Sequence, residues 1–160
     1  MALFELHSRN LAQEQVAHTH DFHQLILATC GVTELSMEGQ GERVTARRGC
    51  LIPSSRHHEY QGDGNNRTLV LDIPVAQLAS LEKGSEIERL FDKPRFFSVP
   101  PALNQLTHAL ANQLEQCPGL QNEIAILLLR ALTMYLHDAT PAAVGQLGQH
   151  CISERLDLAR

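Results

Sequence analysis

The sequence predicts a mainly β domain, a sandwich or barrel of short strands, followed by two helices. Between residues 16 and 74, short apolar runs alternate with clusters of Gly, Pro, Asn and Asp, which is typical of strands joined by turns. After residue 101 the apolar positions recur every three or four residues, which is helical spacing. The chain has 160 residues, of which 43% are hydrophobic, so one domain with a substantial core is expected.

The β half is expected to contain six to eight short strands. Gly31 ends one strand, and Gly39 with Gly41 indicates a hairpin turn, because glycine accepts the positive φ that tight turns require. Pro53 and Pro74 each end a strand, because proline has no N–H to donate to a ladder. The expected strands cover residues 18–28, 32–38, 42–46, 50–52, 57–61 and 67–73, after an arm or short strand within 1–17.

The helical half begins after Pro74. A short helix is expected over 75–81, and residues 92–101 are expected to be irregular or an edge strand. Residues 102–115 predict a helix with one apolar face, formed by Leu103, Leu106, Leu110 and Leu114. Pro118 and Gly119 end it.

The second helix, expected over 121–137, carries apolar residues on more than one face. A helix that packs on one side does not need them. We interpret the excess as a surface for homodimer formation, with deep burial in the core as the alternative. The residues expected at the dimer contact are Ile124, Leu128, Leu132 and Tyr135.

Composition excludes several classes of protein. The formal net charge of −5 argues against a large basic surface for nucleic acid. Residues 1–10 lack the apolar run of a signal peptide, and the apolar run at 124–136 is too short to span a bilayer. The four cysteines form no CxxC pair, so free thiols are expected. A cytoplasmic protein without a membrane segment is therefore predicted.

Histidines gather in two short stretches, 18–23 and 57–58. If the first stretch is extended, alternation places His18, His20 and Gln24 on one face, and His58 could reach the same place. Imidazoles and an amide oxygen are ligands that a divalent transition metal accepts. The candidate metal ligands are His18, His20, Gln24 and His58, for Zn, Ni, Fe or Mn. The alternative is that these polar residues line a barrel mouth without a cofactor, bonded to water or effector.

These residues resemble the cupin superfamily, which implies a β-barrel of the jelly-roll type. The first cupin motif spaces two histidines, an acid and a glycine as this chain spaces His18, His20, Gln24 and Gly31. The second motif spaces Pro, Gly and His as this chain spaces Pro53, Ser55 and His58. The chain departs from the motifs at four positions, where Gln replaces the acid, Ser and Ala replace two glycines, and Gly replaces Asn: Gln24, Ser55, Ala12 and Gly62.

More narrowly, the string His-x-His-Asp-Phe-His-Gln-Leu that begins at His18 is similar to the N-terminal effector-binding domain of AraC-type transcriptional regulators. Leu-Ile-Pro before a histidine and Leu-Asp-Ile-Pro at the end of the β half add to the resemblance, which covers residues 16–74 and 102–137. It implies three parts: a cupin-like sensing barrel over 1–100, a dimerisation helix pair over 101–138, and a linker with the start of a truncated DNA-binding domain over 139–160.

The resemblance implies a ligand-sensing, dimeric, non-enzymatic domain that reaches DNA only through a C-terminal helix-turn-helix part absent from this chain. The residues expected to contact a small-molecule effector are His18, His20, Phe22, Gln24, His58 and Tyr60. One alternative is a small metal-dependent cupin enzyme, a dioxygenase or isomerase, that uses the same histidines with an open coordination position. Another is an inert metabolite-binding module. The sequence shows no serine-nucleophile constellation and no Gly-rich phosphate loop.

Overall fold

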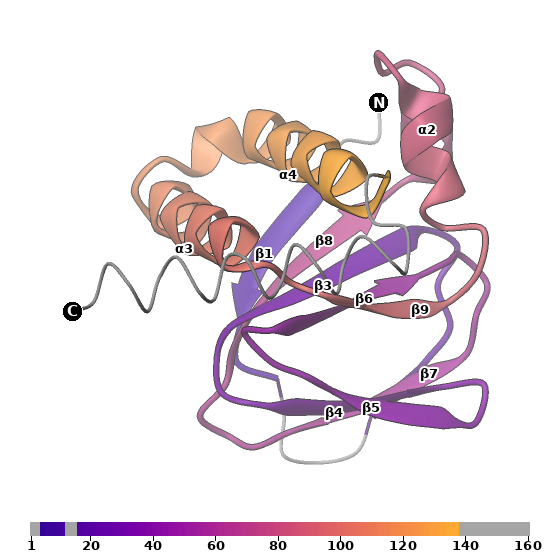
Figure 1. The fold of residues 1–160 in the computed structure, drawn as a ribbon, viewed down its shortest axis with the longest axis vertical. Coiled ribbons are helices and arrows are strands. Elements are labelled where there is room, and N and C mark those ends of the chain that lie inside the picture. The colour runs from indigo at the N-terminus through magenta and orange to yellow at the C-terminus, as the bar shows by residue number, and fades with distance from the viewer. Residues whose placement is uncertain (1–3, 12–15, 138–160) are drawn as a thin grey trace, which may run out of the picture.

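The structure, a computed structural model, describes residues 4–11 and 16–137, and the expected linker and tail of 139–160 lie outside this range. The described strands form two antiparallel sheets that lie face to face (Figure 1). The five-stranded sheet has the order β1 (Glu5–Arg9), β8 (Arg67–Ile73), β3 (His23–Cys30), β6 (Arg48–Ile52) and β9 (Arg95–Ser98). The four-stranded sheet has the order β2 (Val16–His18), β7 (His58–Gly62), β4 (Thr33–Met37) and β5 (Gln40–Val44).

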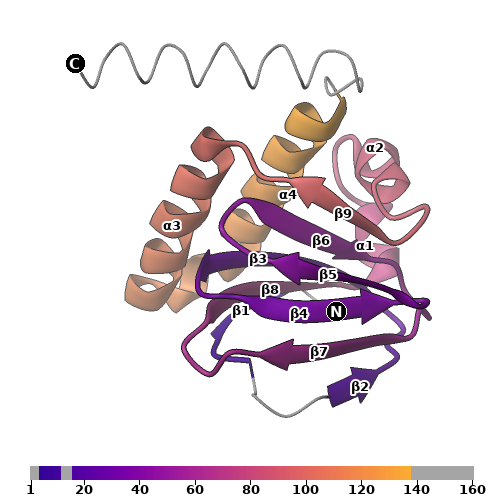
Figure 2. The same cartoon turned by 60° about the horizontal axis from the view of Figure 1, so that its bottom comes forward.

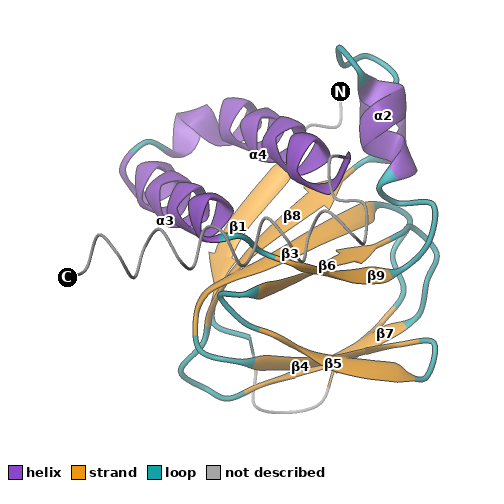
Figure 3. Ribbon diagram, in the orientation of Figure 1, coloured by secondary structure: helices purple, strands orange, loops and turns teal. Residues whose placement is uncertain are grey.

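The helices gather on the outer side of the five-stranded sheet, away from β4 and β5 (Figures 2 and 3). They are α1 (Val75–Leu78), α2 (Gly84–Arg89), α3 (Pro101–Gln116), a 3₁₀ turn (Pro118–Leu120) and α4 (Gln121–His137). Pro101 occupies the first turn of α3, where its missing N–H costs nothing. None of the helices within the described residues combines the length and apolar character needed to cross a membrane.

The predicted fold class is confirmed, because the chain is mainly β with a helix pair after the sheets. The described strands stay in two sheets rather than one continuously bonded barrel, and an isolated bridge between Thr45 and Arg48 links the sheets at one corner. The segment expected to be irregular or an edge strand contains β9, which is an edge of the larger sheet.

Both faces of the five-stranded sheet are buried, and alternation along β3 shows how. Leu25 and Leu27 belong to the core between this sheet and the helices, whereas Ile26 and Ala28 belong to the core between the two sheets. The inter-sheet core comprises Ile26, Ala28, Leu35, Met37, Val44, Cys50 and Ile52, with Tyr60 and Phe96 packed against it. The larger sheet is therefore the central layer of the molecule.

The single strand expected over 18–28 is wrong. The chain forms β2 up to His18, bends at Asp21 and Phe22, and forms β3 from His23 in the other sheet. One continuous strand cannot belong to two facing sheets, so the connection has to break the extended run between them. His18 and Gln24 therefore lie in different sheets, and the alternation argument that placed them on one face does not apply.

The hairpin turn lies one residue earlier than expected. Met37 pairs with Gln40, which leaves Glu38 and Gly39 as a two-residue loop with φ of 50° and 81°. Two successive positive φ values give the turn whose twist matches antiparallel strands. Gly39 fits this geometry as predicted, and Glu38 adopts it although it has a Cβ.

Candidate effector site

The candidate site starts from the pairing of β2 with β7. His18 lies directly opposite His58, and His58 lies opposite Met37 on β4. Side chains directly opposite on neighbouring strands project from the same face. Because Met37 belongs to the inter-sheet core, this register directs the side chain of His58 toward the space between the sheets. The side chain of His18 lies outside what the structure describes.

Three of the predicted effector residues form a cluster of rings, His20, Phe22 and His58. The rings of His20 and Phe22 stack with centroids 4.6 Å apart, and those of His20 and His58 lie 5.1 Å apart at a tilt of 50°. His58 is only 1% exposed, and its Nδ1 lies 3.3 Å from the carbonyl oxygen of Arg56. This ring cluster offers polar nitrogens and flat apolar faces in one place.

The two other described residues of the expected effector set are Gln24 and Tyr60. Gln24 is buried in the larger sheet, where its Nε2 donates a hydrogen bond to Oδ1 of Asp72 at 2.8 Å. Tyr60 packs against the inter-sheet core. The side chain of Gln24 is therefore bonded to β8, a contact that the spacing of the cupin motif did not indicate.

The structure brings two of the four expected metal ligands together, His20 and His58. The side chain of His18 lies outside the described residues, and the bond from Gln24 to Asp72 uses its Nε2 and not the Oε1 that would bind a metal. Among the described His, Cys, Asp and Glu side chains, the group of three whose ligand atoms gather within reach of one ion is Glu5, His7 and Asp72, on β1 and β8.

His23 holds the loop between β6 and β7 in place. It is 6% exposed, stacks on Phe91 at 4.6 Å, and its Nδ1 accepts the backbone N–H of Ser54 at 2.9 Å. Burial lowers the pKa of His23, and the charge of Glu88 opposes this effect. The next residue of the loop, Ser55, donates its N–H to the carbonyl of His20. The loop is thus bonded to the residues on both sides of the bend.

Two cavities lie outside the ring cluster. One, of about 390 Å³, lies along β4, β5 and β7 and is lined in part by Leu35, Glu42 and Tyr60. The other, of about 320 Å³, lies between α3 and the larger sheet and is lined in part by Arg67 and His108. Neither is lined by His20, Gln24 or His58. Sequence reasoning missed both, because each depends on how separate elements pack.

The predicted dimer residues need correction. Ile124, Leu128 and Leu132 are 4%, 1% and 1% exposed and belong to the core under α4, so they cannot form a surface between two chains. They face the larger sheet of their own chain, which is the deep burial considered as the alternative. The fourth predicted contact residue, Tyr135, is 38% exposed and therefore lies on the surface. The other exposed apolar residues of α4 are Leu127 and Met134, at 48% and 69%.

Comparison with known proteins agrees with this architecture. The model of the AraC-like ligand binding domain matches residues 3–137. The chain belongs to this family. The probable transcriptional regulator LumQ of Photobacterium leiognathi is 25% identical over 132 residues, which are 78% of this chain and 50% of LumQ. This AraC-like domain therefore spans about half the length of that relative.

Solved structures of ToxT from Vibrio cholerae share the fold. An apo ToxT variant superposes with a TM-score of 0.52 and 14% identity, covering 71% of this chain and 48% of ToxT. ToxT bound to (E)-4-(8-methylnaphthalen-1-yl)but-3-enoic acid gives a TM-score of 0.50 and 12% identity, covering 84% and 55%. At these identities the likeness concerns the fold of the AraC-like domain.

Proposed function

We propose that this chain is the sensing domain of a dimeric transcription regulator, which binds a small molecule between its two sheets and contacts DNA through a separate domain. The observation that carries the proposal is the buried ring cluster of His20, Phe22 and His58 in an AraC-like ligand-binding domain. LumQ, which resembles this chain over half of its length, supports the link to transcription. In this role the protein would act in the cytoplasm.

The chemistry of the ring cluster favours a small effector that is partly apolar and carries an acceptor. An imidazole N–H of His20 can donate to a carboxylate, and Phe22 with the inter-sheet core offers apolar contact. One structural neighbour, ToxT, is bound to an aryl butenoic acid, which combines these two features. We therefore take amphipathic carboxylic acids as the first class of effector to test.

The test is a thermal-shift screen with aryl and unsaturated carboxylic acids, sugars and neutral aromatics. A ligand that binds only the folded state raises Tm with concentration, by about 2.7 kcal/mol of stability at a hundredfold excess over Kd. The shift should disappear in His20→Gln and His58→Gln and persist in His57→Gln, whose side chain is exposed. A shift retained in both ring-cluster variants would place the effector elsewhere, with the cavity beside Tyr60 as the next site to test.

A non-enzymatic role is favoured over the metal-dependent dioxygenase or isomerase. Such an enzyme needs about three protein ligands with an open position on the metal. The match to the AraC-like ligand binding domain over residues 3–137 supports a ligand-binding role instead.

A further inference from the structure

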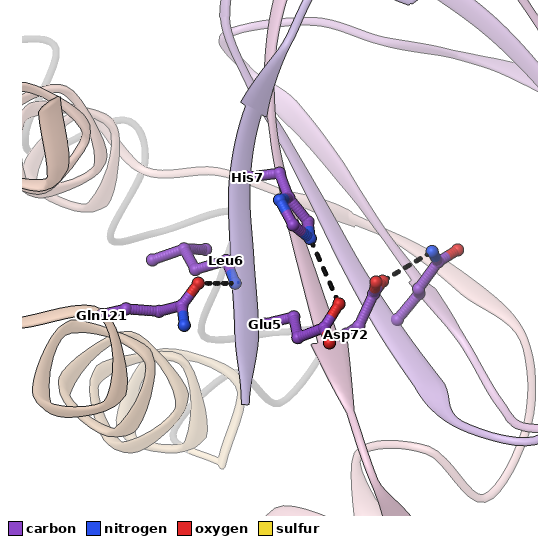
Figure 4. Close-up of polar contacts among 6 residues, drawn as sticks. Glu5, Leu6, His7, Asp72 and Gln121 are labelled. Atoms are coloured by element: carbon purple, nitrogen blue, oxygen red, sulfur yellow. Dashed lines mark hydrogen bonds and ion pairs between the residues drawn. The ribbon is translucent and has the colours of Figure 1, made fainter. Parts of the chain in front are cut away.

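Two carboxylates and an imidazole gather at the free edge of the larger sheet (Figure 4). Glu5 and His7 are two residues apart on β1, and Asp72 on β8 lies directly opposite Glu5. Leu6 is buried toward α4, so alternation places Glu5 and His7 together on the other face of β1. The three ligand atoms lie within 4.8 Å of one another.

This arrangement has an electrostatic cost that a cation removes. Like charges directly opposite one another on neighbouring strands repel, which destabilises the pairing of β1 with β8. Nε2 of His7 lies 3.4 Å from Oε2 of Glu5. The carboxylate of Asp72 accepts a hydrogen bond from the Gln24 amide at Oδ1. The Glu5 side chain is 66% exposed and that of His7 35%, so an ion can reach them from solvent.

We propose that Glu5, His7 and Asp72 bind one divalent transition-metal ion of the zinc class, with water completing its coordination. A nitrogen with two carboxylate oxygens suits Zn²⁺ better than Mg²⁺ or Ca²⁺, which prefer oxygen alone. Two ligands at tetrahedral positions, with bonds of about 2.1 Å, lie about 3.4 Å apart. The 3.4 Å between His7 Nε2 and Glu5 Oε2 matches this spacing, and the carboxylate of Asp72 lies within 4.8 Å of both ligand atoms.

Gln24 has a defined part in this site. Groups that hydrogen-bond to a metal-bound carboxylate fix its orientation, and their loss costs about 10- to 100-fold in affinity. The buried Gln24 amide donates to Oδ1 of Asp72, which keeps Oδ2 for the ion. The residue that replaces the acid of the cupin motif would thus act one step away from the metal, on a site at the sheet edge.

The ion would also connect the sheet edge to a helix. The backbone N–H of Leu6, between the two ligands on β1, donates to Oε1 of Gln121 at 2.9 Å (Figure 4). Gln121 is the first residue of α4. An ion joining β1 to β8 would therefore hold the strand to which the start of α4 is bonded.

The experiment is isothermal titration of Zn²⁺ into tag-free protein previously stripped with EDTA. We expect one ion per chain, a rise in Tm with Zn²⁺, and at least a tenfold loss of affinity in His7→Ala and in Asp72→Asn. Gln24→Leu should weaken binding by about tenfold, which is the low end for a group that orients a metal-bound carboxylate. His57→Ala, which removes an exposed imidazole just before β7, should bind as the wild type does. Melting in EDTA shows whether each variant folds.

Three results would overturn the site. Unchanged affinity in folded His7→Ala and Asp72→Asn would exclude these ligands. Loss in His58→Gln with retention in His7→Ala would move the ion to the ring cluster. Several weak ions that no variant affects would indicate adventitious binding to scattered histidines and thiols. Running the effector screen in EDTA makes its outcome independent of this one.

Discussion

Ser55 occupies the position where the second cupin motif has a glycine. Its backbone conformation explains why a glycine is suited to this position. Its φ of 64° lies in the left-handed region, which costs a residue with a Cβ about 1–2 kcal/mol. The position is fixed by the bond from its N–H to the His20 carbonyl. The motif's glycine therefore reflects backbone conformation, and serine bears the strain.

We predict that Ser55→Gly stabilises the domain. Relief of the left-handed strain exceeds the extra chain entropy that glycine loses on folding, so the free energy of unfolding should rise by about 0.5–1 kcal/mol. Urea unfolding measures this. Ser54→Gly is the matched control, because Ser54 has no positive φ and gains nothing. A Ser55→Gly protein no more stable than wild type would show that the left-handed conformation carries no cost.

His23 gives the domain a pH dependence with a defined sign. Its pKa is lowered by burial, so the unfolded chain takes up a proton at higher pH than the folded protein does. The contribution of neutral His23 to stability is therefore fully present above the pKa of an unfolded histidine, about 6.5, and is lost as the pH falls below that pKa. Protonated Nδ1 could also no longer accept the Ser54 N–H.

We therefore predict that the free energy of unfolding falls as pH drops below about 6.5 in wild type and falls less steeply in His23→Gln. Urea unfolding at a series of pH values gives both slopes. His57→Gln removes an exposed histidine and should retain the wild-type slope. Identical slopes in wild type and His23→Gln would mean that other groups cause the acid sensitivity.

The sequence predicted part of the site at the level of residues. The spacing of His20, Phe22 and His58 indicated one location, and their rings lie together. Glu5, His7 and Asp72 were missed because only the pairing of β1 with β8 joins them. The sequence signal available was the spacing of Glu5 and His7, which places both on one face of a strand, but this spacing does not indicate that Asp72 lies beside them.

At the scale of elements, α4 shows why an apolar excess is ambiguous. Hydrophobicity predicted two apolar faces, yet it did not say which face meets the sheet. The stripe with Ile124, Leu128 and Leu132 packs inward, and Leu127, Met134 and Tyr135 remain outside. We propose this outer face of α4 as the dimer contact in place of the inner one.

Two substitutions one residue apart distinguish the faces. Leu127→Asp should yield a folded monomer, and Leu128→Asp should unfold the chain, because a buried unpaired charge costs several kcal/mol. Sedimentation equilibrium gives the mass and circular dichroism the folding. Met134→Asp should repeat the first result. If both exposed-face variants keep the dimer mass, α4 is not the contact.

Asn66 fixes the end of β1, an arrangement that its position in a polar loop sequence did not indicate. It is 3% exposed, its Oδ1 accepts the N–H of Leu11, and its Nδ2 donates to the Leu11 carbonyl. Thr68 donates to the same Oδ1. The Asn66 side chain thus serves as a hydrogen-bond partner for the backbone of Leu11, two residues after β1.

We predict that Asn66→Ala lowers the free energy of unfolding by roughly 3 kcal/mol, because buried backbone groups of Leu11 lose their partners. Asn65→Ala, at an exposed neighbour, should stay within about 0.5 kcal/mol of wild type. Urea unfolding of both variants tests the pair. Equal effects would show that water replaces the Asn66 bonds.

At the scale of the whole molecule, the boundary expected at residue 100 does not divide the core. Leu25, Leu71 and Phe97 of the larger sheet share one cluster with Leu103 and Leu128 of the helices. The order of strands and helices could be predicted from turn residues and periodicity. This shared burial could not, because it depends on which faces meet.

We predict that a fragment of residues 1–99 does not fold, whereas a fragment of residues 1–137 does. Without α3 and α4 the outer face of the larger sheet would expose its leucines to water, a loss of tens of Å² of apolar burial per side chain at about 25 cal/mol per Å². Cooperative melting followed by circular dichroism decides. A sharp transition in the shorter fragment would mean that the sheets are stable alone.

The central position of β3 has a consequence for hydrogen exchange. Gln24–Ile26 pairs with β8 on one side and β6 on the other, and the strand is covered by helices on one face and by the second sheet on the other. Its amide protons reach water only when the whole domain opens, so their exchange reports the global free energy of unfolding. Amides of the edge strand β5 exchange by local fraying. A molecule bound between the sheets would slow the exchange of β3 amides by the same factor by which it stabilises the folded state, 1 + [L]/Kd.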